Sequence, residues 1–433
     1  MIIFRLCNFM RDRILHQTNI LSMVKRRFSL AMHWQILIML ALGGLFGYFF
    51  PHLTRYTNWM GDVFLRGLNM VIVPLIFCSI MTGVASVGTA ENLGRLGLKT
   101  MGYYVFSTLL AILTGFFFVQ LIKPGVGADL GLQVPVEEIS AGKESFGQVL
   151  LNIVPTNIIR AMSEGNMLAI IFFAILAGFF VTRVGEKSRV LLVDVVNSIL
   201  DVIMKITLFV IKFTPLGVFS IIAKVLSQQI NSGNQVGEII SSMGIYFLTV
   251  LLGLVVQGFI TLPLLVKFLG RANPIKHMRN MSTVLLTAFS TSSSNATLPV
   301  TMEAVESKNG VSNKITSFTI PLGATVNMNG TALYECVAVM FIAQAYGIDL
   351  SFGQQMVVIF TALLAAVGSA GIPMAGLVMM AVVLNAVGLP LEGIGLILAV
   401  DRILDMFRTA INVYGDTCGA VIIAKSEGEQ LTV

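Results

Sequence analysis

Long apolar segments recur along almost the whole chain and constrain its fold more than any other feature. The first runs from Trp34 to Phe50, and others cover about 60–88, 100–123, 148–182, 192–227 and 236–266. A helix that crosses a bilayer needs about 20 mostly apolar residues. Only 12% of the 433 residues are charged and 56% are hydrophobic, whereas soluble domains are roughly 25% charged. We therefore predict an all-α polytopic membrane protein in the lipid bilayer.

The basic residues are distributed as membrane topology requires. The first 30 residues hold six basic residues and one acid, Asp12, and no small-residue cleavage site follows the first apolar segment. Further Lys and Arg lie at 89–99, 183–190 and 267–280, and few lie in the alternate loops. The positive-inside rule then predicts a cytoplasmic segment 1–33, six helices within 34–266, and cytoplasmic N- and C-termini in the cell membrane.

The charge and the cysteines exclude two other classes of function. The net charge of +6 comes from residues between apolar stretches, not from a basic patch interleaved with aromatic residues, so we expect no nucleic acid partner. The four cysteines are far apart and form no Cys-x-x-Cys pair. We therefore expect neither a disulfide framework nor a zinc site.

After Asn280, small and helix-breaking residues interrupt the apolar pattern. Ser290 to Pro299 reads STSSSNATLP, and Gly368 to Gly376 reads GSAGIPMAG. Irregular backbone at membrane depth must be buried in protein or line an aqueous cavity. Both segments could be loops outside the membrane, but apolar residues flank each on both sides. We predict two re-entrant hairpins, at about 276–306 and 353–388.

An apolar helix with a polar interruption follows each hairpin. The helices are expected at about 313–346 and 392–424, and the interruptions are Asn327 to Thr331 and Asn412 to Asp416, both of the form Asn-x-x-Gly. We expect the helix to break at both places. Two such units resemble inverted repeats around a midplane site, and they define a transport core at 267–433.

Charged residues form one stripe on the last apolar helix. At 100° a residue, Asp401, Asp405, Arg408, Asn412 and Asp416 fall within about 90° of each other. Each charge costs about 3 kcal/mol to insert. One interpretation is a structural stripe that neutralises itself, because Asp405 and Arg408 are i, i+3 neighbours. That leaves Asp401 and Asp416 without obvious partners.

The functional interpretation assigns roles by charge. Arg408 and Asp405 are suited to a zwitterion that carries an additional acid group. Asp416, Asn412 and Asn327 offer oxygen ligands to a small hard cation such as sodium, and Ser292–Ser294 offer donors to a carboxylate. Glu335 is either a proton carrier or the partner of a basic neighbour.

These motifs are similar to those of a known family. The segments are TSSSNATLPVT, PLGATVNMNGTALYE, AGIPMAG and DRILDMFRTAINVYGD, with NMVIVPLIF, VPTN, EGNML and FTPLGVF upstream. They resemble the hairpins and core helices of the dicarboxylate/amino acid:cation symporters, the glutamate and aspartate transporters. The resemblance covers nearly everything after residue 34. It implies eight transmembrane helices plus two re-entrant hairpins, a homotrimer, and elevator-type movement of a transport domain in each protomer.

The resemblance also implies roles for individual residues. Asp405 would bind the substrate amino group and Arg408 its side-chain carboxylate. The other implied substrate contacts are Ser293, Ser294, Thr331, Gly371, Ile372, Pro373, Gly376, Thr409 and Asn412. The implied sodium ligands form three sets: Gly323, Asn327, Asn412 and Asp416; Thr325 with Ala366, Val367 and Ser369; and Tyr104, Ser107, Thr108, Asn327 and Asn329. Glu335 matches the proton-carrying Glu of some members.

Three positions depart from the family pattern. Asn329 stands where many members have Asp, which removes a charge from the third sodium site. The second arginine of many members is absent at Ser292 and at Met406. Arg402, one turn before Met406, is either its substitute or an interfacial anchor.

The function expected is uptake of an acidic amino acid with sodium, and with protons as a further candidate coupling ion. The alternatives are a C4-dicarboxylate or neutral amino acid symporter of the same fold, and, from another class, a membrane-embedded enzyme or a channel. A dicarboxylate has no ammonium for Asp405, and a neutral substrate has no carboxylate for Arg408. An enzyme needs a nucleophile and base or metal ligands, and the sequence offers none, so we expect neither catalysis nor a resident cofactor.

Overall fold

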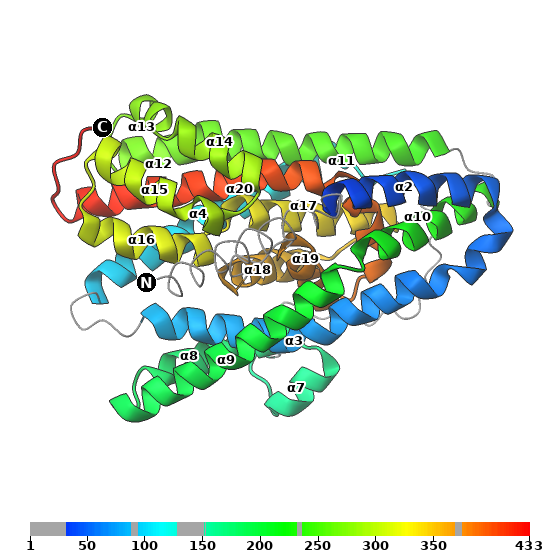
Figure 1. Cartoon of the computed structure of the whole chain (residues 1–433), viewed down its shortest axis with the longest axis horizontal. Coiled ribbons are helices and arrows are strands. Elements are labelled where there is room, and N and C mark those ends of the chain that lie inside the picture. The colour runs from blue at the N-terminus through cyan, green and yellow to red at the C-terminus, as the bar shows by residue number, and fades with distance from the viewer. Residues whose placement is uncertain (1–31, 88–93, 128–150, 152, 232–235, 369–374) are drawn as a thin grey trace, which may run out of the picture.

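The computed structural model describes residues 32–87, 94–127, 151, 153–231, 236–368 and 375–433, and every regular element within them is a helix (Figure 1). The predicted all-α class is confirmed for this part of the chain. Most of the expected cytoplasmic segment 1–33 lies outside it, as do 369–374 in the second expected hairpin.

The helices of the first half correspond to the apolar segments. Their bounds are α2 (Met32–Phe49), the 3-10 helix η1 (Pro51–Tyr56), α3 (Asn58–Val87), α4 (Gly94–Ile122), α7 (Ile158–Glu164), α8 (Met167–Val181), α9 (Glu186–Ile211), α10 (Thr214–Asn231), α11 (Val236–Val256), the π-helix η3 (Gln257–Thr261) and α12 (Leu262–Phe268). The single segment expected at 192–227 is two helices, because α9 and α10 are bent by 49° to each other.

The second half contains the helices of the segments expected to form the hairpins and the core helices. Their bounds are α13 (Pro274–Asn280), α14 (Ser282–Thr291), α15 (Ser294–Asn309), α16 (Asn313–Val326), α17 (Asn329–Ala345), α18 (Phe352–Gly368), α19 (Ala375–Ala386), the 3-10 helix η4 (Leu391–Gly393) and α20 (Ile394–Ser426). The interruption predicted at Asn327 is confirmed, because α16 ends at Val326 and α17 begins at Asn329. The interruption expected at Asn412 is wrong, since α20 continues through it.

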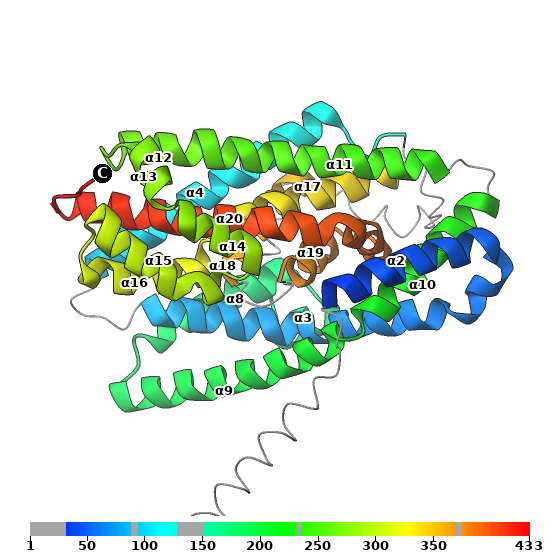
Figure 2. The same cartoon turned by 45° about the horizontal axis from the view of Figure 1, so that its top comes forward.

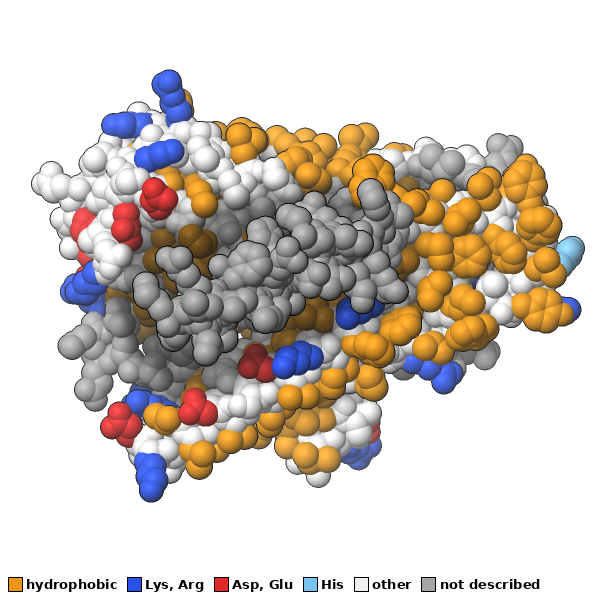
Figure 3. Space-filling view, in the orientation of Figure 1, with side chains coloured by type: hydrophobic (Ala, Val, Ile, Leu, Met, Phe, Trp, Pro, Cys, Tyr) orange, Lys and Arg blue, Asp and Glu red, His pale blue; other side chains and the backbone are white. Residues whose placement is uncertain are grey.

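Length and composition single out a subset of these helices as membrane spans. Among the described residues four helices are long and apolar enough to cross a bilayer, or five if α9 and α10 form one bent span. Several shorter apolar helices accompany them, including α2, α8, α18 and α19. Hydrophobic side chains cover most of the half of the surface in Figure 3 where α2, α3 and α10 lie. Asp and Glu side chains appear mainly in the other half, at the end where α13, α15 and α16 meet and along the lower edge where α9 lies.

Small residues allow the closest helix packing. A Cβ on Gly43 of α2 would lie 2.5 Å from the carbonyl oxygen of Phe219 in α10, and a Cβ on Gly47 would lie 2.5 Å from that of Ala223. Glycines four residues apart let two membrane helices approach until their backbones touch. The Gly-x-x-x-Gly face of α2 therefore fixes its crossing with α10.

The helix α17 forms the centre of the molecule. All its residues except Gln344 are buried, and α4, α11, α18, α19 and α20 pack around it (Figure 2). A helix buried on every side cannot satisfy polar groups with water or lipid headgroups, so a polar side chain on α17 without a partner in the protein is costly. Such partners come mainly from α4 and α20.

Candidate functional site

The site is built where the break between α16 and α17 crosses α20. The side-chain Oδ1 of Asn412 in α20 accepts hydrogen bonds from the backbone N–H groups of Gly330 (2.7 Å) and Thr331 (3.3 Å). Its Nδ2 donates to the Thr331 Oγ1 at 3.0 Å. The first N–H groups of a helix have no partner within that helix. Asn412 therefore caps α17 from a neighbouring helix.

Two glycines make the crossing close. A Cβ on Gly330 would lie 2.7 Å from the carbonyl oxygen of Arg408, and a Cβ on Gly415 would lie 2.6 Å from the Nδ2 of Asn329. The glycine of each Asn-x-x-Gly motif thus faces the helix that carries the other motif. Only glycine leaves room for these contacts.

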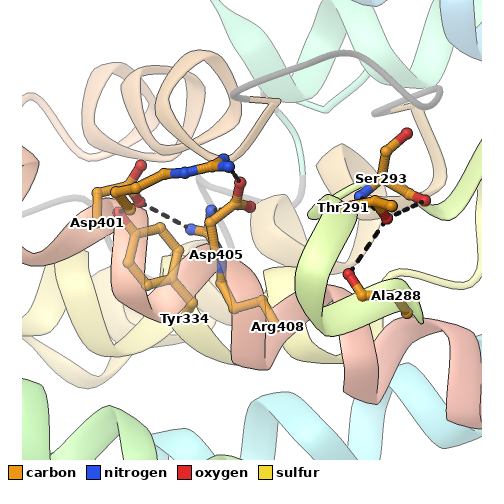
Figure 4. Close-up of polar contacts among 8 residues, drawn as sticks. Ala288, Thr291, Ser293, Tyr334, Asp401, Asp405 and Arg408 are labelled. Atoms are coloured by element: carbon orange, nitrogen blue, oxygen red, sulfur yellow. Dashed lines mark hydrogen bonds and ion pairs between the residues drawn. The ribbon is translucent and has the colours of Figure 1, made fainter. Parts of the chain in front are cut away.

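A buried ion-pair group occupies α20 beside the crossing (Figure 4). The Arg408 Nη2 lies 2.7 Å from the Asp405 Oδ1, and its Nη1 lies 3.1 Å from the Asp401 Oδ1. The Tyr334 hydroxyl donates to the same Asp401 oxygen at 2.6 Å, and the Tyr334 ring lies 3.9 Å below the guanidinium carbon. Asp401, for which the sequence offered no obvious partner, is therefore paired. Tyr334 is a contact that sequence analysis missed, although it directly precedes Glu335.

The Arg408 guanidinium is buried yet not saturated. Its side chain is 1% exposed, and its Nε has no hydrogen-bond partner among the described residues. A Cβ on Gly376, in the first turn of α19, would lie 2.5 Å from Nη1, so glycine there lets α19 approach the cation. Arg402 contacts the other oxygen of Asp405 at 3.4 Å and is partly exposed. It therefore shares Asp405 with Arg408, each arginine contacting one of the two carboxylate oxygens.

Figure 4 also shows the tip of the first hairpin, with Thr291 and Ser293, on the right of the view. α14 ends at Thr291, and Ser292 adopts a left-handed backbone with φ of 50°. The Ser293 Oγ caps α15 by accepting the Ala296 N–H at 3.2 Å, and Ser294 is the first residue of α15. The Thr291 hydroxyl donates to the Ser293 carbonyl at 3.4 Å. The tip is thus a hairpin turn rich in hydroxyl groups, as the sequence predicts.

A second polar cluster lies farther along α20. The Asn327 Nδ2 donates to the Asp416 Oδ1 at 2.8 Å, and a Cβ on Gly323 would lie 2.5 Å from that oxygen and 2.7 Å from the Tyr104 hydroxyl. The Tyr104 hydroxyl itself donates to the Thr319 carbonyl at 2.7 Å. Asp416 is buried and lies near no basic side chain within 4 Å among the described residues. Carboxylate, amide and hydroxyl oxygens therefore converge there.

The hydroxyls of α4 extend this cluster to Asn329. The Thr108 Oγ1 donates to the Asn329 Oδ1 at 2.7 Å, and the Ser107 Oγ lies 3.4 Å from the same oxygen and 3.2 Å from the Asn327 Oδ1. Gln257, in the π-helix η3, donates from Nε2 to the Ser107 carbonyl at 3.4 Å. Sequence analysis missed Gln257, whose signal was a lone amide within an apolar segment.

The remaining candidates are less closely grouped. Thr325 donates to the Leu322 carbonyl within α16 at 2.9 Å, and Ala366 and Val367 lie near the end of α18, which packs against α16. Thr409 is buried in α20. Ser369, Gly371, Ile372 and Pro373 lie outside the described residues. The second expected sodium set is therefore only partly described.

Glu335 is fully buried in α17, two turns after the break. Neither of its carboxylate oxygens has a hydrogen-bond partner among the described residues. Arg408 is near enough to act on this carboxylate electrostatically, but no hydrogen bond or ion pair joins the two groups among the described residues. A buried carboxylate without hydrogen-bond donors is costly in its charged form.

The chain is similar to known membrane transporters. Residues 32–426 match the model of the sodium:dicarboxylate symporter family. The chain is 37% identical to the excitatory amino acid transporter 3 of Mus musculus, over 87% of this chain and 81% of that protein. It is 35% identical to the proton/glutamate-aspartate symporter of Escherichia coli (strain K12), over 93% of each chain. It is also 35% identical to the proton/sodium-glutamate symport protein of Geobacillus stearothermophilus, over 93% of this chain and 96% of the relative.

The match covers both the hairpins and the core helices, so it includes every element that forms the site. The helical fold with its apolar spans and the family match together make this a multi-pass membrane protein whose relatives are transporters. The chain belongs to the sodium:dicarboxylate symporter family.

Proposed function

We propose that this protein is a secondary active symporter that takes up glutamate or aspartate with sodium. The observation that carries the proposal is the buried Arg408, held by two carboxylates and left with an unsatisfied donor in the core of a membrane transporter. A buried, unsatisfied guanidinium can bind a carboxylate through forked hydrogen bonds. The names of the bacterial relatives support the same substrates and both coupling ions.

Substrate binding requires groups of opposite charge close together. Asp405 is partly exposed while Arg408 is buried, so we assign the substrate ammonium to Asp405 and the side-chain carboxylate to Arg408. Thr331, Thr409 and Asn412 would supply further contacts. The hairpin tips, with Ser293 and Ser294 in the first and Gly371, Ile372, Pro373 and Gly376 in the second, would close over the main-chain carboxylate.

Sodium binding is proposed at the oxygen clusters. Asp416 with Asn327, Asn412 and the backbone near Gly323 offers one anionic oxygen and several neutral ones, which suits a small hard cation. The cluster of Tyr104, Ser107, Thr108, Asn327 and Asn329 contains only neutral oxygens, so we expect weaker binding there. Thr325, Ala366, Val367 and Ser369 are proposed as another set. Glu335 is the proposed proton carrier.

The proposed architecture is the eight-helix, two-hairpin fold of the family, working as a homotrimer by elevator-type alternating access. Helices α14 and α15 would form the first hairpin, and α18 and α19 the second. The domain division is helices one to six within 34–266 and the transport core at 267–433. The basic loops support cytoplasmic N- and C-termini in the plasma membrane.

Uptake into proteoliposomes tests the function directly. We expect radiolabelled aspartate to accumulate above its outside concentration when sodium is higher outside, and unlabelled glutamate to compete. Stronger competition by succinate, or by serine and alanine, would instead support the C4-dicarboxylate or neutral amino acid carrier. Absence of concentrative uptake under any cation gradient would contradict symport and leave the channel or enzyme alternative.

A further inference from the structure

An apolar groove runs along the outside of α20, away from the ion-pair group. Its volume is about 220 Å³. α20 forms its floor, and residues of α11, η3, α13 and α14 form its walls. The residues that define it are Val255, Gly258, Phe259, Leu285, Ala410 and Ile411. The polar residues of the proposed transport site do not line it.

The groove results from small residues and a π-helix. η3 inserts an extra residue into the turn that contains Gly258, and a Cβ on Gly258 would lie 2.5 Å from the Ile411 Cδ1. The absence of a side chain at Gly258 lets α20 approach η3. Ala410, beside Ile411, leaves the floor of the groove open.

The groove opens onto an apolar outer surface. Val255 is 43% exposed, Phe259 is 64% exposed, and Leu286, next to the groove-lining Leu285, is 67% exposed. In a membrane protein, exposed apolar side chains of spanning helices face lipid chains. The mouth of the groove therefore meets hydrocarbon, which favours an acyl chain as its occupant.

Unpaired cations lie at one end of the groove. Between Glu238 and Glu303 the chain has no Asp or Glu, and its basic residues there are Lys267, Arg271, Lys276 and Arg279. Arg279 directly follows Met278, which lines the groove, and Lys267 lies about 12 Å along the helix from Phe259. Lys276 donates to the Thr432 carbonyl.

The other three cations have no such anchor. Lys267, Arg271 and Arg279 have no carboxylate within 4 Å in the part of the chain that the structure describes. The positive-inside rule accounts for basic residues on this side of the membrane, but not for their position at the end of an apolar groove. Basic pockets next to helix clefts at the cytoplasmic face bind anionic lipid headgroups.

We propose that this groove binds one acyl chain of an anionic phospholipid, and that Lys267, Arg271 and Arg279 bind its phosphate. The inference is independent of the transported substrate, because it concerns the opposite face of α20. It adds a lipid-binding site to the outer surface of the transport core.

The test uses the full-length protein in liposomes that contain a small fraction of photoreactive phosphatidylglycerol, with a diazirine on one acyl chain, or the matched phosphatidylcholine. We expect phosphatidylglycerol to label the peptides around Val255–Phe259 and Phe407–Ile411 about ten-fold more than phosphatidylcholine. The double change Lys267→Gln and Arg279→Gln should remove this preference, and Ala410→Trp, which fills the groove, should reduce labelling by both lipids.

Matched controls separate the groove from general lipid contact. Arg183→Gln with Lys187→Gln removes two cations from another basic loop, and Leu248→Trp adds bulk on the exposed face of α11 outside the groove. Both should leave the labelling unchanged. If the two lipids label equally, if the Lys267 and Arg279 changes have no effect, or if labelling follows exposure over all helices, the proposal is wrong. Size-exclusion profiles verify that each variant is folded.

Discussion

The two Asn-x-x-Gly segments have the same form in sequence but different structures. At Asn327 the helix breaks, and the backbone N–H groups that follow lack helical partners; at Asn412 the helix continues. The continuous helix supplies what the broken one lacks, because the Asn412 side chain accepts from Gly330 and Thr331. The Asn327 motif therefore interrupts its helix, and the Asn412 motif caps the helix that begins after the interruption.

This difference separates two tasks. The broken helix frees backbone groups and places Asn327 and Asn329 beside the hydroxyls of α4. The continuous helix holds fixed charges in register, with Asp405 and Arg408 one turn apart and Asp416 two turns further on. We infer that α16–α17 mainly provides cation ligands, whereas α20 provides the charges that select the substrate.

The largest effect is expected at the glycine of the broken helix. Gly330→Ala places a methyl group 2.7 Å from a backbone carbonyl of α20, and the backbone cannot move aside as a side chain can. We expect loss of uptake and of folded protein in size-exclusion chromatography. Gly244→Ala, where nothing lies within 4 Å of the added methyl group, is the control.

Gly415 of α20 occupies the position in the second motif that Gly330 occupies in the first, and its replacement should have a smaller effect. The atoms nearest to a Cβ on Gly415 belong to the side-chain amides of Asn329 and Asn327, which can rotate. The protein should fold but need more sodium for half-maximal uptake. If Gly330→Ala also folds and transports normally, the close crossing is not required.

The next largest effect is expected on substrate selectivity when Arg408 of α20 is replaced. Arg408→Cys removes the cation proposed for the substrate carboxylate, so binding of acidic substrates should weaken by several kcal/mol, since a charged hydrogen-bonded pair is lost. Small neutral amino acids should gain relative preference in a competition assay. If aspartate still outcompetes serine and alanine in this variant, Arg408 does not bind the side-chain carboxylate.

The cap itself can be removed. Asn412→Ala leaves the N–H groups of Gly330 and Thr331 without their acceptor, at a cost of about 1–3 kcal/mol each. We expect a melting temperature lowered by several degrees and strongly reduced uptake. Asn385→Ala is the matched control, because that amide makes one hydrogen bond to Asn69 at the surface. Equal shifts in the two variants would show that α17 does not depend on the cap.

The sequence predicted the elements of this site better than their connections. Hydropathy and the spacing of polar residues indicated the helices, the first hairpin tip and the stripe on α20, because these follow from periodicity along one segment. The unbroken course of α20 was not predictable from Asn412–Asp416, since the two motifs differ in their partners and not in their local form. Pairings between helices, such as Tyr334 with Asp401, depend on packing that no single segment encodes.

The comparison also predicts where a proton would be carried. Glu335 lies on the broken helix, buried without a hydrogen-bond partner among the described residues, whereas the carboxylates of the ion-pair group on α20 are ion-paired. Glu335→Gln should therefore abolish the pH dependence of uptake and leave sodium-driven exchange in place. The measurement is uptake from about pH 5.5 to 8, a range that brackets neutral pH. A wild-type profile that is flat, or one that the Gln variant retains, would make Glu335 a structural residue.

A small effect on stability alone is expected at the end of α20. The ion pairs of Glu427 there stabilise the fold and have no part in the proposed coupling of sodium to transport. Glu427 follows α20, and its carboxylate oxygens lie 2.6 Å from the Lys99 Nζ and 2.5 Å from an Arg95 Nη2 at the start of α4. Hydrogen bonds from Lys99 and Arg95 lower the pKa of Glu427 below its ordinary value. The stabilisation is therefore complete above the unfolded pKa of about 4.3 and is lost as the pH falls through the lower folded value.

Because Arg95 is exposed and Lys99 and Glu427 are partly exposed, solvent weakens both ion pairs, and Glu427→Gln should lower the melting temperature at pH 7 by only about 1 °C. The difference from wild type should vanish in acid, and sodium dependence should not change. Glu186→Gln, whose carboxylate lies 3.8 Å from Arg189 and is almost fully exposed, should have a still smaller effect. A change in sodium dependence on mutating Glu427 would mean that the continuous helix transmits coupling along its whole length, which contradicts the division of tasks between α17 and α20.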